Sequence, residues 1–145
     1  PPRINAHPPK YYIPTLIHFD STKKITINPR RLEEGYFIEF NYKKRDGSSQ
    51  QYDCIVLDVY PPGGYVWALK LNDMRKTEFK RVVERFGTIV KEQRGEEFGV
   101  LDVPEKGKQS YQLIQRLNLI QYYRKFIMTE MSLVRIRPID FDSLI

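Results

Sequence analysis

The sequence predicts a mainly β protein with helical additions, namely a small SH3-like antiparallel barrel of about five strands with two or three helices. Residues 32–71 carry the strongest signal, because three strand-like segments follow one another there as two consecutive hairpins. Residues 131–138 alternate in character with a period of two and predict a closing strand. A plain α+β arrangement, with one sheet packed on helices, is the alternative.

The two central hairpins follow from strand-forming residues and turn-forming residues in alternation. Residues 35–42 are rich in aromatic and β-branched side chains, which favour a strand. An Asp-Gly pair at 46–47 suits a turn with positive φ, and residues 52–60 form the returning strand. Residues 61–64 read Pro-Pro-Gly-Gly, a second turn signal, and residues 65–71 are the third strand.

A helix is expected after the third strand, with Asn72 or Asp73 as its cap and Gly87 at its end. Its apolar side chains recur at i, i+3, i+4 and i+7, as on the buried side of a helix. These side chains are Phe79, Val82, Val83 and Phe86.

The remaining segments are assigned with simpler patterns. Residues 24–28 alternate and predict a short first strand. Residues 88–108 are charged and glycine-rich, which predicts a long loop with at most one hairpin. Leucine, isoleucine and aromatic residues recur at helical spacing over residues 110–128, which predicts a second helix.

The N-terminal segment differs in composition from the rest of the chain. Five prolines fall within residues 1–14 and predict an extended arm, which is either loose or lies on a partner. Residues 15–145 are expected to form a single globular domain. The chain starts at Pro1 without a methionine, so we expect a processed protein or a segment of a longer product.

Composition limits the classes of protein that need to be considered. The net charge is +6 and the pI is near 9.4, which makes DNA or another acidic surface a reasonable partner. No apolar run approaches the roughly 20 residues of a membrane span, and no signal-peptide pattern opens the chain. The single cysteine, Cys54, excludes an intrachain disulfide and cysteine-rich zinc sites, and we expect it to be a small buried side chain. We expect no cofactor, no membrane partner and no small-molecule substrate.

The sequence contains no recognisable set of residues that could act together in catalysis, so we expect no enzymatic activity. His7 and His18 are the only histidines, and neither belongs to a recognisable catalytic set. No glycine-rich phosphate loop precedes a lysine and a helix.

One motif nevertheless resembles that of a metal-dependent nuclease. Glu78-Phe79-Lys80 has the acid-x-lysine spacing, and Asp58 and Asp73 lie upstream. The motif falls within the first predicted helix, where Phe79 is buried and its neighbours point sideways to solvent. Since metal-assisted hydrolysis requires carboxylates that converge on one cation, we regard a nuclease as the weakest alternative.

Basic residues are the most informative polar group. Arg30 and Arg31 precede the main strand, and further basic residues occupy the first turn, the end of the second predicted helix and the last strand. We predict that nucleic acid is bound by Lys43, Lys44, Arg45, Arg124, Lys125, Arg135 and Arg137. Arg135 and Arg137 are two residues apart on a strand and face one way, which suits a grip on phosphate. If a small barrel closes, these two arginines and the three basic residues of the first turn form one patch.

Alternatives for these residues remain open. Arg135 and Arg137 instead pair with Asp140, Asp142 or other acids in a purely structural interpretation. Tyr122, Tyr123 and Trp67 stack on bases or belong to the core, and for Trp67 we favour the core. We expect Trp67 to pack on the first helix, so that Trp67→Ala costs roughly 3–5 kcal/mol.

A Gly-led strand from Gly35 is followed by a Tyr-Asp strand from Tyr52 and by the stretch 65–72. In this series of motifs the chain resembles a group of small tailed-phage proteins, some of which are DNA end protectors of T-even-like phages. The resemblance covers mainly residues 30–75, and residues 122–137 are similar more loosely. Lys70 departs from the group's pattern, which has asparagine there.

The resemblance implies a role in the virion or at a DNA terminus, without catalysis. We therefore expect a non-enzymatic phage protein that binds double-stranded DNA without sequence specificity. Genome ends are one place where it would bind. It would be located in the virion, and in the host cytoplasm during assembly. The alternative is a structural head, neck, tail or baseplate protein held by contacts with other phage structural proteins.

Overall fold

The computed structural model describes residues 24–103 and 108–137. The predicted proline-rich arm, residues 1–14, lies outside the described residues, as do both histidines and the acids Asp140 and Asp142. The first expected strand is present but short.

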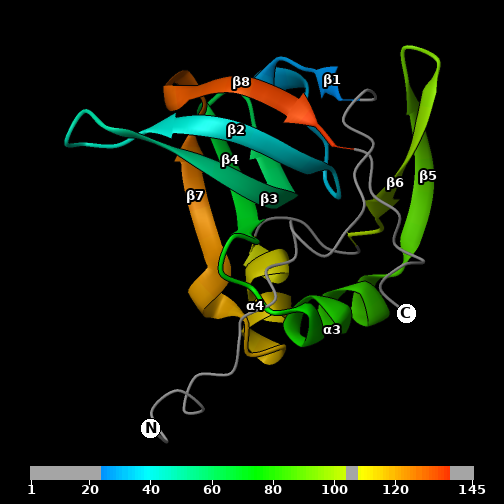
Figure 1. Ribbon diagram of the computed structural model, residues 1–145. Helices are drawn as coiled ribbons and strands as arrows, with labels where there is room; N and C mark the ends of the chain where they lie inside the picture. The colour runs from blue at the N-terminus through cyan, green and yellow to red at the C-terminus, as the bar shows by residue number, and fades with distance from the viewer. Residues whose placement is uncertain (1–23, 104–107, 138–145) are drawn as a thin grey trace, which may run out of the picture.

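Six antiparallel strands form the main sheet, in the order β1-β8-β2-β3-β4-β7 (Figure 1). The strands are β1 (Ile25–Thr26), β2 (Phe37–Lys43), β3 (Ser49–Tyr60), β4 (Tyr65–Lys70), β7 (Tyr123–Ile127) and β8 (Met131–Ile136). A separate two-stranded sheet consists of β5 (Thr88–Gln93) and β6 (Glu96–Leu101). Within the described residues, the helices are α3 (Lys76–Phe86) and α4 (Lys108–Arg116), with 3-10 turns η2 (Pro29–Arg31), η3 (Ile120–Tyr122) and η4 (Met128–Glu130).

The prediction of a mainly β protein with two consecutive central hairpins is confirmed. β2 pairs with β3, and β3 pairs with β4. The turns use the residues that the sequence indicated, since Gly47 and Gly64 have φ values of +87° and +72°. The expected loop over residues 88–108 contains one hairpin, β5–β6.

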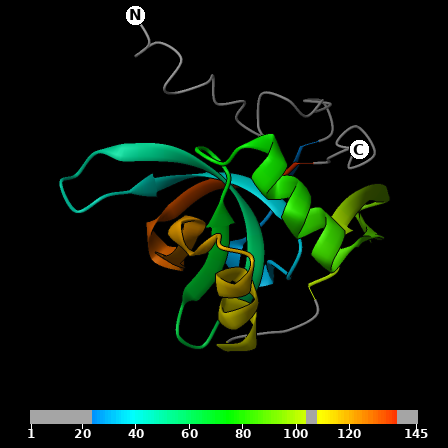
Figure 2. The same ribbon diagram turned by 90° about the horizontal axis from the view of Figure 1, so that it is seen from below.

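The main sheet buries both of its faces. Alternate residues of β3 face opposite sides, so Ile55 and Leu57 pack with the helices while Cys54 and Val56 pack in a second cluster. Viewed from below, α3 and α4 lie on the same side of the sheet (Figure 2). The buried Cys54 agrees with its expected role as a small apolar side chain.

The sheet is not closed into a barrel. β7 leads into β8 through the short turn η4, yet the two strands stand at different places in the sheet and do not pair. Side-chain packing takes the place of a ladder between β2 and β7: the Phe126 ring lies 4.9 Å from Phe40 and 5.0 Å from Tyr42. The Tyr42 hydroxyl also accepts a hydrogen bond from the Ile127 N–H at 3.1 Å.

The second predicted helix is correct only in its first half. α4 ends at Arg116, and residues 123–127 form the strand β7. Asn118 adopts φ +63°, a left-handed conformation that ends helices, and the Leu119 N–H bonds back to the Ile114 carbonyl at 3.1 Å. Helical spacing was misleading here, because the aromatic and apolar residues after Asn118 also suit a strand.

The first predicted helix is confirmed, but its cap is different. Arg75 is the N-cap residue, and the Glu78 carboxylate accepts the Arg75 N–H at 2.9 Å. The Asn72 side chain instead accepts the Asp53 N–H at 3.0 Å and so supports the end of β4. Phe79 and Val82 are fully buried, and Gly87 ends the helix as expected.

The prediction that Trp67 packs on α3 is wrong. Trp67 is half-buried and belongs to neither hydrophobic cluster. It shares a face of β4 with Leu69, but the helices cover only the Leu69 end of that face. The Trp67 ring instead lies beside Tyr65, at 5.9 Å between centroids, and under the Lys125 ammonium at 5.8 Å.

Candidate nucleic-acid interface

The β2–β3 hairpin carries three adjacent basic residues at its tip, which projects from the body of the molecule (Figure 1). Lys43 is the last residue of β2 and pairs with Ser49. The Lys44 N–H donates to the Ser48 carbonyl at 2.8 Å, which closes the turn around Arg45. All three side chains are exposed, and none of them forms an ion pair with a described residue.

One acid lies within the same turn. Asp46 accepts hydrogen bonds from the Ser48 hydroxyl at 2.6 Å and from the Ser48 N–H at 2.9 Å. These bonds, with a smaller contribution from the charge of Lys44, lower the pKa of Asp46. Its carboxylate is therefore used to shape the turn, and it forms no ion pair within 4 Å with the hairpin's basic residues.

The base of the hairpin opens into a groove of about 630 Å³ that a fourth basic residue joins. Lys125 comes from β7, and its ammonium lies 3.9 Å from the centre of the Tyr65 ring. The basic residues that line this groove are Lys43, Lys44, Arg45 and Lys125. We call it the hairpin groove.

Aromatic side chains and one acid complete the hairpin groove. Tyr42 and Tyr65 line it, and the Tyr42 hydroxyl is fixed by the Ile127 N–H. Glu130 is the acidic residue in the lining. Among the described lining residues, four cations therefore face one carboxylate on a surface that includes aromatic rings, and such a surface attracts polyanions.

Arg124 is close in sequence to the hairpin groove but does not line it. Its guanidinium donates to the carbonyls of Gln121 at 2.7 Å and Tyr123 at 2.9 Å. Since neighbouring residues of a strand face opposite sides, Arg124 and Lys125 point away from each other. Tyr122 and Tyr123 pack against the core, as the structural alternative required.

Arg135 in β8 and Arg137, which directly follows β8, point to the same side, as predicted, but both form ion pairs with buried acids. Arg135 forms an ion pair with Glu39 at 2.7 Å. Arg137 contacts the same carboxylate at 3.2 Å and Asp53 at 2.9 Å. Lys24 adds a third cation to Glu39 at 2.9 Å, so two buried acids and three partly exposed or partly buried cations form one ion network.

The pKa values of the two acids in this network are shifted in opposite directions. Burial alone would raise the pKa of Glu39, but a hydrogen bond from Lys24 and the charges of Arg137, Lys24 and Arg135 outweigh it and lower that pKa. Burial raises the pKa of Asp53, because its desolvation outweighs the charge of Arg137 and the hydrogen bond that Arg137 donates.

The structure does not bring the predicted basic residues into one patch. In the sheet, Arg135 pairs with Glu39, and the Arg137 N–H bonds to the Phe37 carbonyl. These positions are four and six residues along β2 from Lys43, which corresponds to about 13 and 20 Å. The last strand does lie beside the first hairpin, but its arginines stand at the opposite end of β2.

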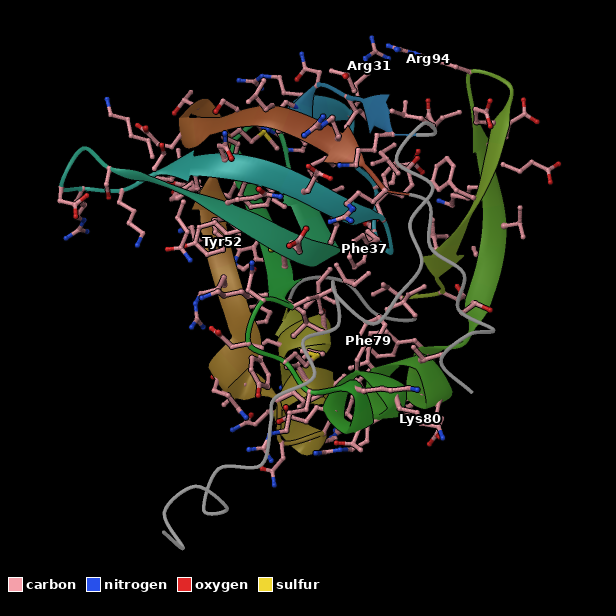
Figure 3. The ribbon with its side chains drawn as sticks, in the orientation of Figure 1. Arg31, Phe37, Tyr52, Phe79, Lys80 and Arg94 are labelled. Atoms are coloured by element: carbon pink, nitrogen blue, oxygen red, sulfur yellow. The ribbon has the colours of Figure 1, made fainter. Side chains whose placement is uncertain are left out.

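The nuclease motif is used structurally. The Glu78 carboxylate accepts the Tyr122 hydroxyl at 2.7 Å as well as the Arg75 N–H, which corrects the expectation that it points to solvent. Figure 3 shows Phe79 directed into the core and Lys80 on the outer side of α3. Within residues 24–103 and 108–137, no group of three or more acidic, histidine or cysteine side chains converges as a metal site.

The aromatic lining of the hairpin groove was missed by sequence reasoning. Tyr65 meets Lys125 only because β4 pairs with β7, and the β7 residues had been assigned to a helix. The aromatic and β-branched residues Tyr123, Phe126 and Ile127, which favour a strand, were the signal that could have revealed β7.

Comparisons with known proteins add no assignment to this geometry. No known protein family, curated protein or solved structure matches the chain. In the part of the chain that the structure describes, no helix has both the length and the apolar character to cross a membrane.

Proposed function

We propose that this protein binds the backbone of double-stranded DNA through the hairpin groove, without catalysis and without sequence specificity. One observation carries the proposal: four basic side chains from two elements, β7 and the β2–β3 hairpin, line a single groove next to two tyrosines. None of the four forms an ion pair with a described residue, so their charges are available to a ligand.

The chemistry of these residues suits phosphate. Lysine ammonium groups act as mobile point charges, and the Arg45 guanidinium offers a fork that matches two phosphate oxygens. Phosphate contacts fix a protein on a duplex but contain no base information, so binding of this kind tolerates any sequence. The net charge of +6 favours the same partner at longer range.

We further infer that the sheet is an opened SH3-like barrel. Strands β8-β2-β3-β4-β7 are neighbours in this order, and a single 3-10 turn connects β7 to β8. Both features suit a five-stranded barrel in which α3, the β5–β6 hairpin and α4 are inserted between β4 and β7. The hairpin groove then lies at the end of the barrel where β2 and β7 approach each other.

The biological setting that we propose is a phage virion. Its support is the resemblance of residues 30–75 to small tailed-phage proteins, including DNA end protectors. A binder that reads only the backbone suits genome ends of any sequence. Such a protein would meet the DNA in the host cytoplasm during assembly and stay with it in the particle.

A second candidate is a structural virion protein held by protein contacts. The observation in its favour is the β5–β6 hairpin, which stands apart from the main sheet (Figure 1). Its residues Ile89 and Val90 are 40% and 68% exposed, and adjacent exposed apolar side chains on a projecting strand favour a protein partner.

Equilibrium titration of labelled duplexes separates the two candidates. We expect the full chain to bind two duplexes of unrelated sequence equally well at low salt, and K43A/K44A/R45A to weaken both alike. The control K76A/R85A/R116A removes the same charge from the exposed surface of the helices and should bind nearly as the unchanged protein does. Equal losses in the two triple variants would show that only net charge matters and would contradict a site in the hairpin groove.

A further inference from the structure

A second groove lies at the opposite end of β2 from the hairpin groove and is lined by three arginines. It has a volume of about 770 Å³, and its basic residues are Arg30, Arg31 and Arg94. The first two belong to η2, and the third stands in the β5–β6 turn. We call it the arginine groove. None of its described lining residues also lines the hairpin groove.

The β5–β6 hairpin is held firmly beside η2. Lys91 forms an ion pair with Glu33 at 2.9 Å, and the Gln93 side chain donates to the Tyr36 hydroxyl at 3.2 Å. The Tyr36 ring meets Phe98 edge-on at 5.4 Å. These contacts fix the position of the turn, so Arg94 is brought to the groove by the fold.

Arg94 adopts a backbone conformation that disfavours it. Its φ is +52° and that of Gly95 is +80°, the combination found in a tight type I′ hairpin turn. Asparagine is the favoured residue at the first of these positions, and a long side chain there costs stability. Residues in unfavourable backbone conformations cluster at functional sites, so the arginine at this position is consistent with a role of its side chain.

The charges of the arginine groove are free to meet an anion. Neither Arg31 nor Arg94 forms an ion pair with a described residue. Arg30 uses one N–H to bond the Pro61 carbonyl at 3.0 Å, which orients its guanidinium. Glu33 is the acid in the lining, and Lys91 neutralises it. Figure 3 shows Arg94 extending from the turn towards Arg31.

We propose that the arginine groove binds a ligand with two or more phosphate groups. Guanidinium forks bind phosphate oxygens in pairs, and arginines from two separate elements can hold neighbouring phosphates. A groove of about 770 Å³ is larger than one phosphate requires. The ligand is either a polynucleotide backbone or a free phosphorylated molecule, since both present the same groups.

Calorimetric titration of the full chain with tripolyphosphate tests the site, and a short DNA duplex distinguishes the two sources. We expect R31A/R94A to lose at least tenfold in affinity, since one charge-assisted hydrogen bond is worth about that factor. Loss for both ligands indicates a polynucleotide, and loss for tripolyphosphate alone indicates a free phosphorylated molecule. K76A/R85A removes the same charge outside both grooves and should bind as the unchanged protein does.

Arg94→Asn separates binding from folding. Asparagine suits the turn, so this variant should unfold at the same or a higher urea concentration while its affinity falls about tenfold. The proposal is overturned if Arg94→Asn and R31A/R94A bind both ligands as tightly as the unchanged protein. It is also overturned if K76A/R85A loses as much affinity as R31A/R94A.

Discussion

The α-carbon of Gly35 lies so close to the Leu101 carbonyl that a β-carbon there would stand 1.9 Å from the oxygen. The Leu101 N–H donates to the Gly35 carbonyl at 3.0 Å, which joins the end of β6 to the start of β2. Gly35 also has φ +90°. The two sheets of the molecule therefore meet at a position where only glycine fits.

Gly35→Ala should lower the free energy of unfolding by about 3 kcal/mol or more, because the colliding atom is backbone and cannot turn away. Gly47→Ala is the matched control: its φ is +87°, but its β-carbon would meet no atom within 4 Å. That variant should lose about 1 kcal/mol from backbone strain alone. Urea titration measures both, and equal losses would show that the contact with Leu101 has no importance.

Glu39→Gln should destabilise the protein by about 3 kcal/mol, because it leaves buried or partly buried cations without their shared anion. Glu39 is 3% exposed and meets Lys24, Arg135 and Arg137. Glu84→Gln, at an exposed position of α3, should change stability by less than about 0.5 kcal/mol. A small effect of Glu39→Gln in urea titration would mean that the network contributes little to stability.

The two buried acids should have opposite effects on how the free energy of unfolding changes at acidic pH. The pKa of Glu39 is lowered below its usual 4.5, so its contribution is complete above pH 4.5 and is lost as the pH falls through the lowered value. The pKa of Asp53 is raised above its usual 3.8, so its contribution is complete below pH 3.8 and is lost as the pH rises through the raised value.

Acidification of the unchanged protein therefore removes stability through Glu39 and restores some through Asp53. Glu39→Gln should flatten the loss of stability below pH 4.5, and Asp53→Asn should steepen it. Urea midpoints measured across this pH range provide the test. Parallel curves for the two variants would rule out these opposite shifts.

Trp67→Ala should lower the free energy of unfolding by roughly 1–2 kcal/mol, because the Trp67 ring is only half-buried and its cation contact is with Lys125. Phe79→Ala, which empties a fully buried position under the sheet, should cost about 3–5 kcal/mol. If thermal or urea unfolding gives Trp67→Ala the larger loss, Trp67 has a structural role that its surroundings do not show.

Local patterns predicted the central hairpins and α3, because residues close together in the sequence determine these turns and this helix. Gly47 and Gly64 supply the turns, and Phe79 with Val82 and Phe86 supplies a clear helical period. The end of α4 could not be predicted in the same way. Its position depends on Asn118 in a left-handed conformation and on the pairing of β7 with β4.

The candidate site was predicted only in part, because sequence spacing does not report which charges meet. Lys43, Lys44 and Arg45 are neighbours in the chain and were found together. Lys125 joins them through a strand that was not foreseen. Arg135 was expected to bind phosphate, yet its partner Glu39 is 96 residues away in sequence and could not be inferred.

The salt dependence of duplex binding reports how many phosphates the hairpin groove contacts. Each phosphate contact releases counterions, so a plot of log affinity against log salt between about 50 and 200 mM has a slope near −0.9 per contact. We predict a steep slope for the full chain and a slope shallower by up to about 2.7 for K43A/K44A/R45A. The control K76A/R85A/R116A should keep the original slope. Absence of binding at the lowest salt, or the same slope for K43A/K44A/R45A as for the unchanged protein, would contradict DNA binding through the hairpin groove.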